Sequence, residues 1–147
     1  MADDTGATPN PRLGSLNRLV GTWDVSGPEI RGRVIFEWME GGFFLVQRVA
    51  LDHAGDRIRG VEYIGYDEES GHLKSHYFGN SVGVLEYAYE LEGDVLRIWF
   101  GDVGSPARFE GRFSDDGDTN TGAWTWPGGG YESTMTRVEP FGEGKAS

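Results

Sequence analysis

The chain has 147 residues, a formal net charge of −11, 24 glycines and no cysteine. This length predicts a single domain that buries a core without help from a disulfide or a metal. The missing cysteines exclude disulfides, zinc knuckles, iron–sulfur clusters and a thiol nucleophile. Because phosphate contacts depend on clustered cationic charge, 13 Lys and Arg against 24 Asp and Glu argue against a nucleic-acid partner.

The N-terminal residues 1–11 are polar and lack the basic start and apolar core of a signal peptide. No apolar run in the chain approaches the ~20 residues that span a bilayer. We therefore expect a cytoplasmic protein with no membrane partner. Its domain is expected at 12–139, between disordered tails at 1–11 and 140–147.

A short helix is predicted at 12–20, where apolar residues recur at helical spacing. Gly14 weakens the helical propensity of this segment. The pattern consists of Leu13, Leu16, Leu19 and Val20. A helix of this length fits as a plug across one end of a barrel.

Strand-length segments rich in β-branched and aromatic residues follow, separated by clusters of Gly, Asp, Asn and Ser that favour turns. A flat meander of so many strands would leave two exposed edges, so we predict an all-β, up-and-down antiparallel barrel of about ten strands. The predicted segments are about 19–26, 30–39, 43–52, 57–66, 72–79, 83–91, 95–101, 106–113, 120–126 and 131–138.

Alternation of apolar and polar residues indicates one drier and one wetter face on several of these strands. The clearest example is 85–92, where Leu85, Tyr87 and Tyr89 alternate with charged or small residues. The run at 41–51 does not alternate cleanly, so the inward or outward facing of the third to fifth strands stays open.

The tripeptide Gly21-Thr22-Trp23 opens the first strand, and Arg137 lies on the last one. A Gly-x-Trp motif at this place with an Arg on the closing strand resembles the calycin barrels, which include lipocalins and fatty-acid-binding proteins. The resemblance implies that Trp23 plugs the base of the barrel and that Arg137 packs over its indole, where a cation–π contact stabilises the closure.

Three longer stretches resemble a bacterial family of uncharacterised lipocalin-like ten-stranded barrels, which is distantly similar to fatty-acid-binding proteins and nitrobindins. Between Gly27 and Ile30 there is no room for the lid helices of fatty-acid-binding proteins, so the mouth is expected to be open or gated by a loop. Nitrobindins bind haem through a His near the C-terminus, whereas no His follows His76 here, so no cofactor is expected. The stretches are LVGTWDVSG (19–27), GVEYIGYDEESG (60–71) and GYESTMTRVE (130–139).

A barrel of this size can hold a small-molecule cavity, so inward aromatic residues are either ordinary core or the wall of a binding site. Five Trp and six Tyr favour a ring-containing ligand over a fatty acyl chain. The candidates are Trp38, Tyr87, Tyr89, Phe109, Trp124 and Trp126.

Four polar residues are candidates for the chemistry of the interior. One of Gln47 and Arg48 is expected to point inward and hold a polar head group, and an inward Arg48 would favour a carboxylate ligand. Glu62 shares its parity with Ile58, and if that set faces inward Glu62 becomes a general-base candidate. His76 is either an outward histidine or a lone base in the pocket.

No metal site is predicted. His72 and His76 share one strand face but lie about 13 Å apart along the strand, too far to ligate one ion. The acidic segment 114–120 lacks the spacing and the closing Glu of a calcium loop, so we interpret it as a hairpin turn.

The first functional hypothesis is a barrel that binds a small hydrophobic, possibly aromatic, ligand. The alternative is an enzyme on the same barrel, an isomerase or cyclase without metal or nucleotide cofactor, with Glu62 and His76 as catalytic candidates. A protein-interaction module is a weaker hypothesis, because the outward faces that can be assigned are charged and lack an apolar patch. A homodimer stays open.

Overall fold

The computed structural model describes residues 7–81 and 83–138 and contains one 3-10 helix followed by ten strands. Each strand pairs antiparallel with its neighbours in sequence, and β1 pairs with β10, which closes the barrel. The predicted all-β, up-and-down barrel with a short N-terminal helix is thereby confirmed. The elements are η1 (Pro11–Leu19), β1 (Gly21–Ser26), β2 (Ile30–Trp38), β3 (Leu45–His53), β4 (Asp56–Asp67), β5 (His72–Gly79), β6 (Val84–Glu92), β7 (Val95–Phe100), β8 (Arg108–Phe113), β9 (Thr119–Trp126) and β10 (Gly129–Arg137).

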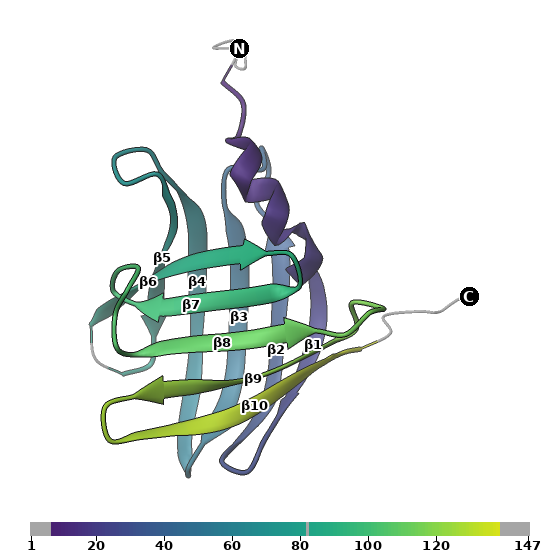
Figure 1. Ribbon diagram of the computed structural model, residues 1–147, viewed down its shortest axis with the longest axis vertical. Helices are drawn as coiled ribbons and strands as arrows, with labels where there is room; N and C mark the ends of the chain where they lie inside the picture. Colours follow the sequence, from purple (N-terminus) through teal and green to yellow (C-terminus); the bar gives the residue numbers. More distant parts are fainter. Residues whose placement is uncertain (1–6, 82, 139–147) are drawn as a thin grey trace.

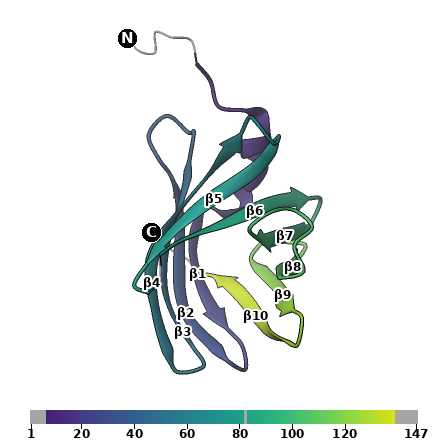
Figure 2. The same ribbon diagram turned by 90° about the vertical axis from the view of Figure 1, so that its left-hand side faces the viewer.

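The barrel is flattened into two facing layers. Strands β1–β4 run along one side, and β6–β10 cross them on the other (Figure 1). The view turned by 90° shows the two layers (Figure 2). The interior between them is where the inward side chains of all ten strands meet.

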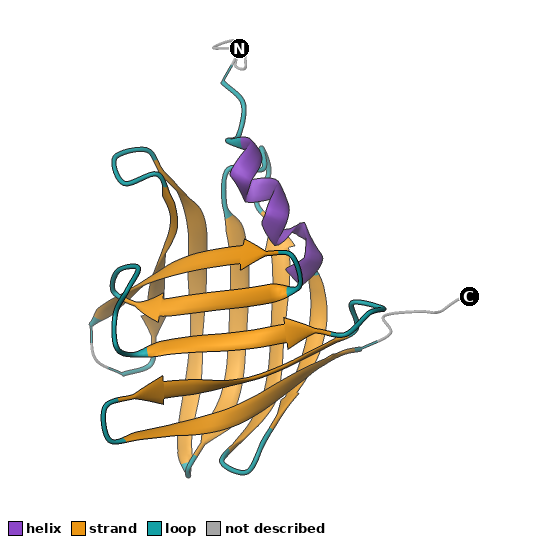
Figure 3. Cartoon of the chain, in the orientation of Figure 1, coloured by secondary structure: helices purple, strands orange, loops and turns teal. Residues whose placement is uncertain are grey.

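The helix η1 covers one end of the barrel (Figure 3). Asn10 caps it by accepting a hydrogen bond from the backbone N–H of Arg12 at 2.9 Å, and Pro11 stands at its first position. Its three leucines are buried. They recur at intervals of three, and a 3-10 helix has three residues per turn, so they form one apolar line facing the core. No helix among the described residues is long and apolar enough to cross a membrane.

The pairing register decides the facing that the sequence left open. On β3, Leu45 and Gln47 face inward and Arg48 faces outward, because Gln47 pairs with the inward Glu62 of β4. Val46 faces outward but is only 4% exposed. The ring of Phe44 turns back over the outer face of the sheet, close enough to Gly65 that an added Cβ there would clash with it. Because Phe44 covers this part of the outer face, apolar residues lie on both faces of the strand, and 41–51 therefore shows no clean alternation.

The outer face of β2–β6 carries apolar side chains in addition to charged ones. These exposed residues are Ile35, Tyr63, Phe78 and Val84. The rings of Tyr63 and Phe78 meet edge to face, with centroids 6.1 Å apart. The expectation of no apolar patch covered only the outward faces that alternation assigned, and so it did not include Tyr63 on β4 or Phe78 on β5. Ile35 on β2 and Val84 on β6 do lie on assigned outward faces and were not counted there.

The predicted tails lie mainly outside the described residues, since 1–6 and 139–147 are not among them.

Candidate functional site

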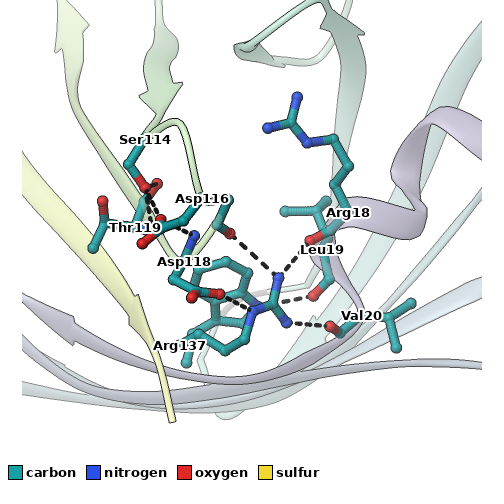
Figure 4. Close-up of polar contacts among 10 residues, drawn as sticks. Arg18, Leu19, Val20, Ser114, Asp116, Asp118, Thr119 and Arg137 are labelled. Carbon is teal, nitrogen blue, oxygen red and sulfur yellow. Dashed lines mark hydrogen bonds and ion pairs between the residues drawn. The ribbon is translucent and has the colours of Figure 1, made fainter. Parts of the chain in front are cut away.

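The end of the barrel under η1 is sealed by two side chains. The Trp23 side chain is fully buried, and its indole N–H donates to the backbone oxygen of Leu19 at 2.8 Å. The Arg137 guanidinium lies over the indole, 4.2 Å from the ring centroid. It also donates to the backbone oxygens of Val20 (2.6 Å) and Arg18 (3.0 Å) (Figure 4). These contacts tie the first strand, the last strand and the helix together.

We call the end of the barrel opposite η1 the mouth. The β1–β2 and β3–β4 hairpins lie at this end, away from η1 (Figure 1). Two inward-facing aromatic residues stay exposed there, Phe100 at 46% and Trp126 at 41%. Deeper rings such as Tyr87 and Trp124 are half-buried. The aromatic side chains at the mouth are therefore more exposed than Trp23 at the opposite end.

A buried carboxyl group lies midway along the barrel. Glu62 of β4 is 3% exposed and accepts three hydrogen bonds from neighbouring strands. Gln47 Nε2 donates at 2.5 Å from β3, Ser75 Oγ at 2.6 Å from β5 and Tyr89 Oη at 2.8 Å from β6. Antiparallel pairing of β3 to β6 brings these four side chains together on one inner face.

Burial raises the pKa of Glu62 above its ordinary value of 4.5, although the hydrogen bonds from Ser75, Tyr89 and Gln47 act to lower it. Burial also raises the pKa of Tyr89 well above 10.0, with a further contribution from the charge of Glu62. Burial, together with Glu62, raises the pKa of Tyr87 to about 12. These phenols are thus neutral near pH 7, and the carboxyl is the group that can gain or release a proton.

Three polar groups of the interior have no hydrogen-bond partner in the described part of the chain. They are the hydroxyl of Tyr77, the side-chain amide of Asn120 and Nε2 of His53. The ring of Tyr77 lies flat against Gly60 and Gly79, where an added Cβ would come within about 2.5 Å of it. Buried polar groups are normally paired, so these groups are exceptions within the described interior.

Aromatic rings line the wall across from β4. Trp124 of β9 contacts Tyr87 with ring centroids 6.0 Å apart and Phe109 with centroids 5.9 Å apart. Tyr87 in turn contacts Phe100 at 5.6 Å. Three strands thus supply one continuous aromatic surface, with Phe100 extending it to the mouth.

Most residues proposed for the site point into the barrel. Glu62, Gln47 and Tyr89 are in direct contact. Trp38 lies at the sealed end, where its indole N–H donates to Asn17 Oδ1 at 2.9 Å. The others that face inward are Tyr87, Phe109, Trp124 and Trp126.

Two proposed residues lie outside. Arg48 points to solvent and pairs with Glu37, Nε to Oε2 at 3.1 Å. The strand alternation that turns Gln47 inward forces Arg48 outward, so the head-group role is not available to it. His76 is also exposed, with Nε2 3.6 Å from Glu86 Oε2. It shares its face with the outward Lys74, and it cannot act inside the barrel together with Glu62.

Sequence reasoning missed Ser75, Tyr77 and His53. The first two alternate with Lys74 and His76, so the outward facing of those two polar residues could have indicated them. His53 was not among the candidates, but its ring contacts that of Tyr131 at the mouth, with centroids 4.3 Å apart and the rings tilted. No local sequence pattern predicts that contact, because Tyr131 lies far from His53 along the chain.

Within residues 7–81 and 83–138, no three His, Asp or Glu side chains gather closely enough to hold a metal ion. Comparison of the chain with protein-family models and with curated proteins finds no match.

Proposed function

We propose that the barrel is calycin-like and binds a small, mainly apolar, ring-containing molecule inside, with its polar atoms held by the group around Glu62. The observation that carries this proposal is the aromatic surface of Tyr87, Phe109 and Trp124 lying near a buried carboxyl inside the barrel. Binding sites for small molecules are mostly apolar with a few well-placed polar groups.

The unpartnered hydroxyl of Tyr77 and amide of Asn120 support the same proposal. A buried polar group without a partner costs about 1–3 kcal/mol. A ligand that hydrogen-bonds to them would recover that cost. The sealed base and the exposed rings at the mouth give the ligand one direction of entry.

Native mass spectrometry of the protein purified from its own host tests the proposal. We expect excess mass that disappears on denaturation and that falls in the Trp124→Ala variant. Phe78→Ala is the matched control, since Phe78 is an exposed aromatic residue on the outer face. Loss of the extra mass in the control but not in Trp124→Ala would place the ligand outside the barrel and reject the proposal.

A second candidate is acid–base catalysis on a bound substrate, as in an isomerase. It is favoured by the buried position and raised pKa of Glu62, which suit a carboxyl that donates a proton to one substrate atom and regains one from another. The role falls to Glu62 without His76. Glu62→Gln would then remove turnover while Gln47 and Ser75 continue to hold the substrate, and turnover unchanged in this variant would exclude the mechanism.

A further inference from the structure

We infer that the bound molecule carries a positively charged nitrogen, which pairs with the carboxylate of Glu62 among the aromatic rings of the barrel. This inference rests on the proposed function and names the chemical class of its ligand.

Among the described residues, the interior offers a carboxylate in Glu62 and no free Lys or Arg side chain. Away from the hairpin ends and the sealed base, Glu62 is the one acid or base that the described strands turn inward. Arg137 is engaged at the base with Trp23 and with backbone oxygens. Arg48 is outside, paired with Glu37. An anionic head group such as a fatty carboxylate would therefore lie beside Glu62 with no cation to balance it.

Glu62 has no basic partner among the described residues, and its hydrogen bonds come from three neutral side chains. Oε1 accepts from Gln47 and Tyr89, whereas Oε2 accepts from Ser75 alone. A carboxylate has about four acceptor sites, so Oε2 can accept another hydrogen bond. An ammonium group would supply both that donor and the missing positive charge.

The surroundings of Glu62 also favour a cation. The electron-rich faces of Tyr and Trp attract positive charge, and Tyr77 and Tyr87 lie close enough to Glu62 for its charge to raise their pKa values. Glu29 and Asp56 are exposed at the hairpins of the mouth. The same hairpins also carry the exposed Arg31 and Arg57, so it is the net charge of the whole chain, −11, that favours cations over anions.

Matched probes distinguish the ligand classes. Phenethylammonium, phenethyl alcohol and phenylpropanoate share one aromatic tail, and tryptamine, tryptophol and indolepropionate share another. Titration calorimetry is expected to show the ammonium of each set binding about tenfold or more tightly than its alcohol, with the carboxylate weakest. An alcohol that binds as tightly as its ammonium would overturn the inference and leave the proposed function standing.

Glu62→Gln keeps a side chain of the same size that can hydrogen-bond, and it removes the charge. It should abolish the preference for the ammonium without weakening the alcohol. Glu86→Gln is the control, because it removes one negative charge from the outer face of the neighbouring strand β6. A preference that survives in Glu62→Gln, or that is lost equally in both variants, contradicts the inference.

The pH dependence of the unmodified protein gives a test that does not depend on a variant. The titratable groups facing Glu62 are Tyr77, Tyr87 and Tyr89, which stay neutral below pH ~9. Lowering the pH protonates Glu62, so ammonium binding should weaken while alcohol binding stays constant. Parallel pH profiles for the two probes would reject the inference. Binding of none of the six probes would count against the proposed function itself, and the inference would fall with it.

Discussion

The two ends of the barrel differ in how their aromatic side chains are used. At the base, Trp23 is fully buried, hydrogen-bonded to Leu19 and covered by Arg137. At the mouth, Trp126 and Phe100 face the interior but stay exposed. An aromatic ring that is packed and hydrogen-bonded stabilises the fold, whereas one left half-covered retains surface that a ligand can bury. The difference separates a structural end from the end at which we propose that a ligand binds.

The largest expected effect is at the base. Trp23→Ala removes a fully buried indole and should lower the free energy of unfolding by about 3–5 kcal/mol. Urea unfolding followed by circular dichroism measures it. Trp126→Ala is the matched control at the mouth, where 41% of the residue is exposed, and it should change stability by less than about 1 kcal/mol. Equal losses of unfolding free energy in the two variants would show that the two ends contribute equally to stability.

Arg137→Lys tests whether the base needs the guanidinium group or only a positive charge, because the charge is kept. A lysine cannot reproduce the planar guanidinium that contacts the indole and donates to both Val20 and Arg18. We expect a loss of about 1–3 kcal/mol in the free energy of unfolding. Arg48→Lys, in an exposed ion pair with Glu37, should cost less than about 0.5 kcal/mol. A similar loss for both variants would show that charge alone matters at position 137.

Glu62 makes the stability of the middle of the barrel depend on pH. Because burial raises its pKa in the folded state above 4.5, the folded protein holds this proton more tightly than the unfolded chain does. The stability that Glu62 contributes is therefore complete below pH 4.5 and is lost as the pH rises through the raised folded pKa.

Glu62→Gln removes that titration. The free energy of unfolding of Glu62→Gln, compared with that of the unmodified protein, should increase as the pH is raised from about 4.5 toward neutral. Urea unfolding at a series of pH values measures the difference, with Glu86→Gln as the control in an exposed position. Curves for Glu62→Gln and the unmodified protein that stay parallel over this range would show that Glu62 keeps an ordinary pKa.

The smallest effect is expected for His76. His76→Gln changes an exposed side chain whose one charged neighbour is Glu86, so the free energy of unfolding should change by less than about 0.5 kcal/mol. Probe binding, measured by calorimetry, should be unaffected. A loss of probe binding in this variant would mean that the outer surface contributes to the site.

The strands and the helix could be predicted because their signals are local. Turn-forming clusters such as 114–120 separate the strand-length segments, and residues 83–91 alternate clearly. The contact between Trp23 and Arg137 followed from a family resemblance and could not be derived from composition. The 3-10 form of the helix is explained afterwards by the spacing of its leucines.

The site was harder to predict, because each of its members depends on a neighbour in another strand. Glu62 was a candidate under only one of two facings. His76 was a candidate because histidine titrates near neutral pH, a property that does not show whether the side chain faces inward or outward. Ser75 and Tyr77, on either side of His76 in the sequence, face inward. Ser75 donates to Glu62, and Tyr77 lies against Gly60 and Gly79.

The sequence by itself determined that this chain forms a single all-β barrel of about ten strands with a helix before the first. Turn propensity and the alternation of apolar residues act within a few residues, so they can be read along the chain. Only the tertiary structure decided which face of β3 to β5 lies inside. A shift of one residue in strand pairing turns every side chain to the other face, and the register that places Gln47, Glu62 and Tyr77 side by side is set by contacts between strands.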